Sequence, residues 1–245
     1  MTPHLHPSLA MTAHRPWPLP DTPWIWRQTW TDLAFLHWRI PAATLRPLVP
    51  AGLEIDTFDG SAWLGLVPFA LSDFSIRRLP AVPWLSAFRE TNLRTYVTDG
   101  RKAGVWFFRL DATRALAVLG ARIGLGLPYV WSRMAMTRST GIDYQVHRGR
   151  AALDVSYRAA GPASAAAPGS LASFLTERYC LYAMHLGRLR RLEIHHGPWL
   201  LQDGSATIRQ NSIPEAVGLP PAIGSPLVHI AARQDVIGWP PTLVS

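Results

Sequence analysis

Polar side chains alternate with other residues along residues 90–96, which read ETNLRTY. In a β-strand successive side chains point to opposite faces, so Glu90, Asn92, Arg94 and Tyr96 would share one face. Such a face could line a cavity in which Glu90 transfers protons and the other three bind a ligand. The alternative is a polar stripe facing solvent on an antiparallel sheet, and the residue types leave both interpretations open.

A second candidate is Arg178. Apolar side chains recur at three- and four-residue steps along residues 170–186, which predicts a helix with Ser170 at its N-cap. Arg178 and Tyr182 would lie on the apolar face of this helix. A buried arginine is costly unless it is paired, so Arg178 either pairs with an interior carboxylate or extends to solvent. Such a buried pair often only fixes packing, so a role in a site and a structural role both stay open.

The sequence contains no motif that is typical of a cofactor or metal site. The sequence contains nine histidines, but none has metal-binding spacing within a predicted element, and His195 and His196 would point to opposite faces of a strand. Nucleophile-elbow, phosphate-loop and dinucleotide motifs are absent from the sequence. We therefore expect no metal and no cofactor. A lone cysteine, Cys180, excludes an intrachain disulfide and is typical of a cytoplasmic protein.

The charge and composition of the chain limit the kinds of molecule to which it is expected to bind. The net charge is +8, and Lys102 is the only lysine among the basic residues. The arginines are spread along the chain without a basic stripe, which argues against nucleic-acid binding and allows an interior that binds carboxylates or phosphates. No apolar run reaches the roughly 18 residues of a membrane span. We expect residues 1–23 to form a loose tail without a secretory signal, and residues 24–245 to form one domain.

The local patterns predict a mainly β protein. Asp-Gly turns at residues 59–60 and 99–100 lie between strand-like segments and predict two hairpins. A helical spacing of Ala and Leu covers residues 111–123. Further strands are expected at residues 33–40, 127–139, 141–149, 151–159, 188–196, 205–213 and 226–239. Many strands with few helices favour an antiparallel β-barrel or a β-sandwich.

Several phrases of the sequence together resemble a known family. They are LAFLHWRI, LRPLVPAGLEIDTFDGSAWLGLVPF, RETNLRTYV, GVWFFRLDA, LPYVWSRM and SLASFLTERYCLY. The combination resembles the uncharacterised YqjF-like proteins, which are grouped with the acetoacetate decarboxylase-like superfamily, and it extends from about Trp26 to Trp239. The resemblance implies an antiparallel β-barrel with a central cavity and a few flanking helices.

The same resemblance argues against lysine chemistry. Acetoacetate decarboxylase uses a Schiff-base lysine, and the matching segment here is residues 121–123, where Arg122 stands and no lysine is present. Lys102 follows a turn, where we expect a solvated and fully charged amine. The decarboxylase glutamate best matches Glu90, while Arg94 and Arg122 would hold an anion.

Two functional hypotheses follow. The first is a cavity protein that binds a small polar or carboxylated organic molecule, with Glu90 as the catalytic acid or base of a lyase- or hydrolase-like reaction if it is an enzyme. Asn92, Arg94, Tyr96, Arg122 and Arg178 would bind the ligand or brace the site. The second is a non-catalytic module that senses a ligand or binds a protein partner. For that role, Trp17, Trp24 and Trp26 look exposed and could form an interface.

Overall fold

The computed structural model describes residues 6–79, 86–115 and 124–244, and these residues are mainly β-structure. The strands are β1 (Trp26–Ile40), β2 (Glu54–Ile55), β3 (Ala62–Ile76), β4 (Phe88–Thr98), β5 (Ala103–Ala112), β6 (Tyr129–Trp131), β7 (Arg133–Arg138), β8 (Ile142–Arg148), β9 (Ala151–Ala165), β10 (Cys180–His185), β11 (Arg188–His196), β12 (Leu200–Asn211), β13 (Leu227–Gly238) and β14 (Thr242–Leu243). The short helices are η1 (Pro7–Ala10), α1 (Ala42–Leu45), η2 (Arg46–Leu48), α3 (Leu171–Thr176) and η3 (Glu215–Val217).

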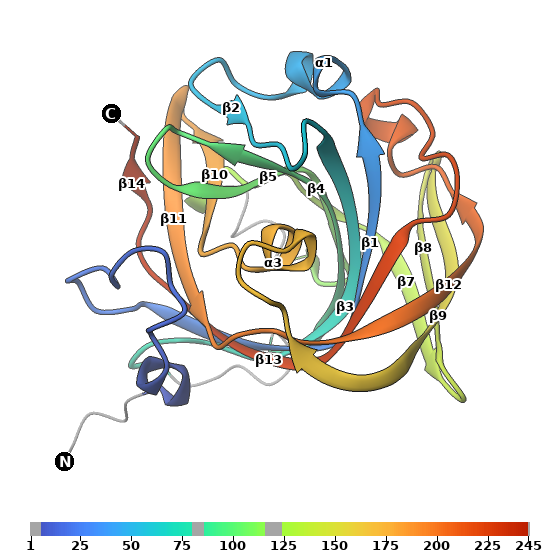
Figure 1. Cartoon of the computed structure of the whole chain (residues 1–245), viewed down its shortest axis with the longest axis horizontal. Helices are drawn as coiled ribbons and strands as arrows, with labels where there is room; N and C mark the ends of the chain where they lie inside the picture. The colour runs from blue at the N-terminus through green and yellow to red at the C-terminus, as the bar shows by residue number, and fades with distance from the viewer. Residues whose placement is uncertain (1–5, 80–85, 116–123, 245) are drawn as a thin grey trace.

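All strands belong to one sheet, in the order β14-β11-β10-β5-β4-β3-β1-β13-β12-β9-β8-β7, with β2 paired to β4 and β6 paired to β5. The pairings are antiparallel except for β10 with β5 and β5 with β6. An additional pairing joins β11 to β13. Strands β11, β10, β5, β4, β3, β1 and β13 therefore form a closed circuit of pairings, seen end-on in Figure 1.

The closing strand β13 pairs with β1 along one edge, and its other edge is divided between two partners. Its first half pairs with β12, for example at Ile230, and its last residues pair with β11, where Gly238 lies opposite Ile194. A Cβ atom on Gly238 would lie 2.1 Å from the ring of Trp26. Glycine is therefore needed here, because the indole packs directly on the backbone that completes the circuit.

Alternation along β1 gives the sheet two apolar faces. Leu33 and Phe35 point into the circuit, whereas Ala34 and Leu36 belong to a core cluster with Tyr144 of β8. That cluster lies between the circuit and the layer of β7, β8, β9 and β12, at the right of Figure 1. Both faces of β1 are thus buried at this point, which explains why residues 33–36 are apolar without alternation.

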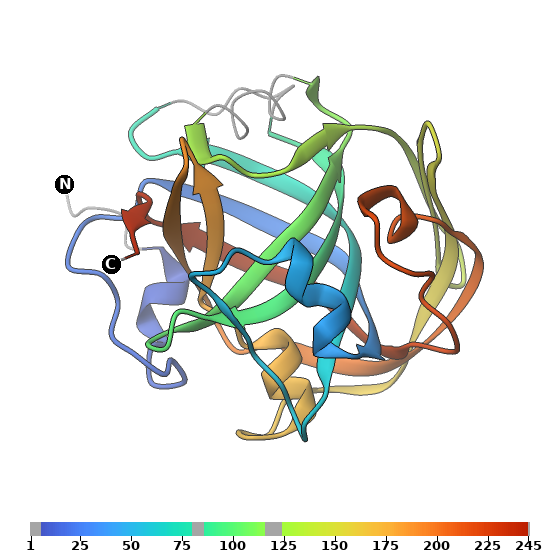
Figure 2. The same cartoon turned by 90° about the horizontal axis from the view of Figure 1, so that it is seen from above.

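Helix α3 lies across one end of the circuit, in the centre of Figure 1 and at the bottom of Figure 2. Ser170 caps it as expected, because its hydroxyl accepts a hydrogen bond from the backbone N–H of Ser173 at 3.2 Å. The prediction of a helix over residues 170–186 is wrong, since α3 ends at Thr176 and residues 180–185 form β10. Pairing with β11 and β5 overrides a periodicity that suits a helix as well as a buried strand.

The two hairpin predictions have different outcomes. The Asp-Gly turn at residues 99–100 joins β4 to β5, as expected. The turn at residues 59–60 closes only an isolated bridge between Phe58 and Ser61, and β2 pairs with β4 instead of β3. The predicted helix over residues 111–123 begins inside β5, which continues to Ala112, and residues 116–123 lie outside the described ranges.

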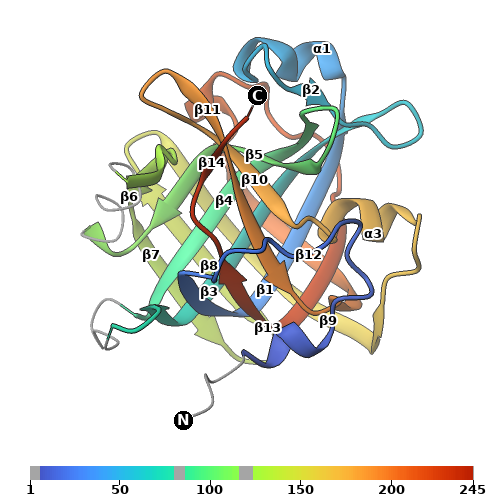
Figure 3. The ribbon, with the colours of Figure 1, turned by 90° about the vertical axis from the view of Figure 1, so that its left-hand side faces the viewer.

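Both chain ends contact β11: β14 pairs with its edge at Arg190 and Arg191 (Figure 3), and the N-terminal segment packs on its outer side. Arg15 is 9% exposed and donates to the carbonyl oxygen of Ile194 at 2.8 Å. Trp17 donates its indole N–H to Glu193 at 3.0 Å. This part of the N-terminal segment is therefore packed and not loose, while the proposed boundary at residue 23 stays a prediction. Within the described ranges, no helix has the length and apolar character to cross a membrane.

Candidate functional site

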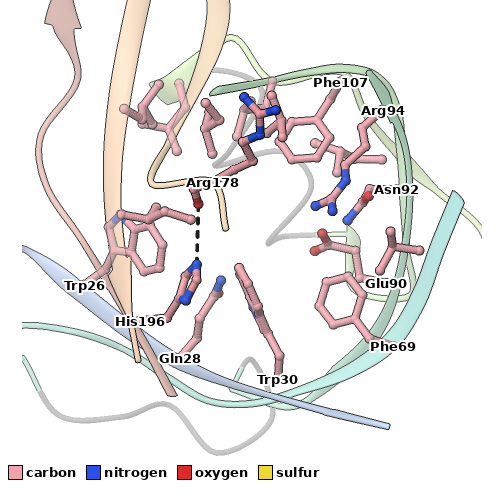
Figure 4. A pocket seen from close by; sticks show the side chains of 18 of the residues that line it. Trp26, Gln28, Trp30, Phe69, Glu90, Asn92, Arg94, Phe107, Arg178 and His196 are labelled. Carbon is pink, nitrogen blue, oxygen red and sulfur yellow. Dashed lines mark hydrogen bonds between the residues drawn. The ribbon is translucent and has the colours of Figure 1, made fainter. Parts of the chain in front are cut away.

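A cavity of about 390 Å³ lies inside the closed circuit, shown from close by in Figure 4. Its wall comes from β1, β3, β4, β5, β10 and β11, with further contributions from β6 and α3. Most of the lining side chains are aromatic or aliphatic. A polar group interrupts them on β4, where Glu90, Asn92 and Arg94 point inward from alternate positions. The face-sharing prediction is therefore confirmed for these three side chains.

Glu90 is the acidic group of the cavity and is 5% exposed. The hydroxyl of Tyr129 donates to its Oε2 atom at 2.9 Å. Burial raises the pKa of the Glu90 carboxyl to about 8, with a further rise from the charge of Asp111 and a counteracting effect of the Tyr129 hydrogen bond. Glu90 is thus mainly protonated at pH 7 and can donate a hydrogen bond or a proton.

Arg94 supplies a guanidinium group beside Glu90. Its Nη2 atom donates to the carbonyl oxygen of Leu175 at 3.2 Å and to the hydroxyl of Tyr96 at 3.4 Å. No acidic side chain forms an ion pair with Arg94 in the part of the chain that the structure describes. Its guanidinium therefore has the charge and the free N–H donors that binding an anion requires.

Asn92 lies between Glu90 and Arg94 on the same wall (Figure 4). It is 6% exposed, and its Oδ1 atom is buried without a hydrogen-bond partner among the described residues. The amide nitrogen in Figure 4 points toward the other two polar groups. A ligand oxygen held by Arg94 could therefore also accept a hydrogen bond from Asn92.

Tyr96 differs from the expectation, because it is fully buried and does not line the cavity. Its hydroxyl donates to the carbonyl oxygen of Leu175 at 2.7 Å and lies 2.6 Å from His37 Nε2. The β4–β5 register shifts between Leu93 and Arg94, just before this position. Tyr96 therefore fixes the end of α3 beneath the cavity and positions Arg94 by contact.

Arg178 lines the cavity but is already paired. Its Nη1 atom lies 2.6 Å from Asp56 Oδ2, and its Nε atom donates to the carbonyl oxygen of Phe174 at 2.7 Å. The guanidinium also packs over the Phe174 ring, 4.2 Å from the ring centroid. Pairing with a carboxylate was one of the two alternatives expected for this arginine, and it is the one observed. Arg178 braces the loop after α3 and leaves Arg94 as the unpaired cation.

The wall opposite β4 carries uncharged polar side chains that were not among the predicted site residues. Figure 4 places His196 and Gln28 there, next to Trp26 and Trp30. His196 Nδ1 lies 2.7 Å from the carbonyl oxygen of Gly197, and burial lowers the pKa of His196 to about 4. This wall is therefore uncharged at neutral pH.

Aromatic rings form much of the remaining lining. Trp30 and Trp199 stack with centroids 6.0 Å apart, and Phe35 meets Trp199 edge-on at 4.9 Å. Trp30 also packs against Phe69 at 5.7 Å. These rings support one another in fixed orientations, so the apolar part of the cavity is preformed.

No lysine lines the cavity, so no group there can form a Schiff base. Lys102 does not line it; the ammonium lies 2.5 Å from Glu193 Oε1 on the outer side of β11, near Trp17. The expectation of a solvated amine is therefore wrong, because the lysine is paired and mostly buried. Arg122 lies outside the described residues, so its predicted role is untested.

Two further expectations concern metals and exposed tryptophans. No group of three potential metal-binding side chains occurs within the described ranges. Trp17 and Trp24 are half-buried, and Trp26 lines the cavity. None of these three indoles is exposed, which removes the observation that favoured a protein-binding surface.

Tyr129 is the clearest residue that sequence reasoning missed. It lies in β6, which pairs in parallel with β5 and brings its hydroxyl to Glu90. Tyr129 lies in the phrase LPYVWSRM, one of those that carry the family resemblance, and this was the available signal. His196 could not be found in this way, because an adjacent histidine pair says nothing of which strand face points inward.

Comparison with known proteins agrees with this fold. The structure superposes on the enduracididine biosynthesis enzyme MppR complexed with pyruvate, with a TM-score of 0.66 and 13% identity over 91% of each chain. An acetoacetate decarboxylase-like enzyme from Sphingomonas wittichii RW1 gives a TM-score of 0.63 at 14% identity, covering 96% of this chain and 99% of that one. The chain is therefore a mainly β protein with the acetoacetate decarboxylase-like fold.

Sequence comparison is more specific. Residues 27–235 match the family model DUF2071, described as an uncharacterized conserved protein. The uncharacterized protein YqjF of Bacillus subtilis (strain 168) is 44% identical over 226 residues, which cover 91% of this chain and 93% of that protein. The chain belongs to this family, and the resemblance to YqjF-like proteins is confirmed.

Proposed function

We propose that the closed circuit is the wall of a β-barrel whose cavity binds a small organic molecule with a carboxylate or a similar polar group. The observation that carries this proposal is the unpaired guanidinium of Arg94, which shares one cavity wall with Asn92 and Glu90. Arg94 and Asn92 bind the anion. Glu90, mainly protonated at pH 7, donates a hydrogen bond to a neighbouring ligand oxygen.

The same arrangement supports proton transfer. A carboxyl group with a pKa near 8 exchanges protons readily near neutral pH, and Tyr129 orients it. The chemistry is then a lyase- or hydrolase-like reaction in which Glu90 is the catalytic acid or base and no Schiff base forms, because the chain's one lysine lies outside the cavity. Pyruvate bound to MppR, a protein of the same fold, suggests 2-oxo acids as test ligands.

Thermal-shift measurements with a panel of small carboxylates and 2-oxo acids test the binding. We expect acids to raise the melting temperature of the wild type, because a ligand that binds only the folded state stabilises it. Arg94→Ala abolishes this shift, whereas the control Arg27→Ala, on an exposed position of β1, retains it. A shift that survives Arg94→Ala would contradict the proposed site.

Hydrogen–deuterium exchange at carbon distinguishes an enzyme from a non-catalytic sensor. The methyl signal of pyruvate is followed by proton NMR in D₂O with wild type and Glu90→Gln. If Glu90 transfers protons, the wild type accelerates exchange and the variant does not, although both bind the acid. Binding without accelerated exchange would favour a sensor.

A further inference from the structure

The size and lining of the cavity indicate what the ligand carries besides its anionic group. We infer that the ligand is an amphipathic monocarboxylic acid, with its carboxylate at Arg94 and Asn92 and an apolar body that extends across the cavity toward β11. This inference rests on the proposed function of the β4 wall. It adds a substrate class that differs from the short, polar 2-oxo acids.

The volume of the cavity is too large for a short acid alone. A water molecule occupies about 30 Å³ of liquid, and second-row ligand atoms with their hydrogens are of similar size, so a cavity of about 390 Å³ holds on the order of a dozen non-hydrogen atoms. A three-carbon acid at Arg94 would leave most of that space to water. Water is poorly accommodated there, because the lining beyond β4 offers it few polar partners.

The charged and the aliphatic lining groups lie on opposite walls of the cavity. In the closed circuit, β4 is separated from β11 by β5 and β10 on one side and by β3, β1 and β13 on the other, so the two strands face each other. Leu192 and Ile194 of β11 line the cavity opposite Glu90 and Arg94. An acid bound at β4 therefore directs its other end to aliphatic side chains, with Trp30 along its path (Figure 4).

The charges of the lining side chains suit a ligand with one carboxylate. Arg94 is an unpaired cation, whereas Arg178 is paired with Asp56. The imidazole of His196 on the far wall is neutral at pH 7, because burial lowers its pKa. A second carboxylate at that end would be buried with no second unpaired cation among the described lining residues, at a large cost.

Isothermal titration calorimetry with straight-chain acids tests the inference on the wild-type protein. Propanoate, hexanoate and decanoate are compared at pH 7, with decanedioate as the dianionic control and decan-1-ol as the neutral one. Full burial of one methylene tightens binding about fourfold, so decanoate binds at least tenfold more tightly than hexanoate, and hexanoate more tightly than propanoate. Decanedioate and decan-1-ol each bind at least tenfold more weakly than decanoate.

Two variants locate the ends of the ligand. Arg94→Met weakens all three acids and leaves decan-1-ol unchanged. Ile194→Phe fills the far end, weakening decanoate at least tenfold while propanoate stays within twofold. Leu192→Phe is a second variant of the same design if Ile194→Phe does not fold, and circular dichroism checks both.

The outcomes separate the two proposals. If propanoate binds as tightly as decanoate and Arg94→Met abolishes both, the extended ligand is wrong and the carboxylate site stands. If decanedioate matches decanoate, the restriction to one carboxylate is wrong. If no acid binds, or if Arg94→Met binds acids like the wild type, the proposed function itself fails and the inference fails with it.

Discussion

Charged residues lie in two very different settings on opposite sides of this sheet. On the outer side of β11, Glu193 accepts ion pairs from Arg15, Lys102 and Arg191, and Arg191 also pairs with Asp99 at 2.7 Å. Inside the circuit, Glu90 and Arg94 are neighbours on β4 but form no ion pair with each other or with another described residue.

The difference indicates what each group is for. The outer cluster satisfies its own charges, and it connects the N-terminal segment, the β4–β5 turn and β11. The β4 groups leave hydrogen-bonding capacity and charge unused, which costs stability unless a ligand completes them. We therefore expect substitutions in the outer cluster to destabilise the fold, and substitutions on β4 to affect binding.

The largest expected effect is that of Glu193→Ala. Removing this carboxylate leaves Arg15, whose side chain is 1% exposed, and Lys102 without their shared partner. We expect a loss of about 3–4 kcal/mol in the free energy of unfolding, measured by urea denaturation. The control is Glu215→Ala, at an exposed position of η3, with a change below about 0.5 kcal/mol. Equal losses in both variants would contradict the structural role of the cluster.

We expect Glu90→Gln to raise the free energy of unfolding, whereas Glu193→Ala lowers it. The pKa of Glu90 rises from its ordinary value of 4.5 to about 8 on folding, so its contribution to stability is complete below pH 4.5 and is lost as the pH rises through 8. The neutral amide has no such loss. We expect the variant to be more stable than the wild type by about 3 kcal/mol at pH 7 and equally stable at pH 4. Urea denaturation at the two pH values measures this, and a stability difference that does not change with pH would disprove it.

A matched pair of arginine substitutions gives the smallest effect and the most direct comparison. Arg191→Met leaves Asp99, whose side chain is 3% exposed, without its guanidinium, and we expect a loss of about 2 kcal/mol. Arg94→Met removes a charge that has no ionic partner, and we expect a change within about 1 kcal/mol. Thermal denaturation of both variants without ligand compares them; a larger loss for Arg94→Met would show that Arg94 is chiefly structural.

The sequence predicted the part of the site that depends on local alternation. Glu90, Asn92 and Arg94 follow the period of a strand, and a two-residue turn fixes the register of β4 against β5 up to the shift at Arg94. Tyr96 could not be assigned in the same way. Its surroundings come from α3, which lies about 80 positions later in the sequence.

Pairing between strands distant in the sequence accounts for the other predictions that were wrong or incomplete. Residues 180–185 carry a pattern compatible with helix or strand, and only the neighbours β5 and β11 decide between them. The turn at residues 59–60 likewise forms as predicted, but β2 pairs with β4 and not with β3, the strand that follows the turn. The far wall of the cavity belongs to β11, so no local pattern could connect His196 with Glu90.

The closure between β13 and β11 also has a consequence for how the protein is made. The pairs that complete the circuit involve residues 236–238, and β1 pairs with the same strand across about 200 positions of sequence. A ribosome must therefore release almost the whole chain before the circuit can close, and pairings of such long separation form slowly. Until then the apolar inner face of the early strands has no enclosure, and a newly synthesised chain depends on the late strand β13 both to cover that face and to form the cavity.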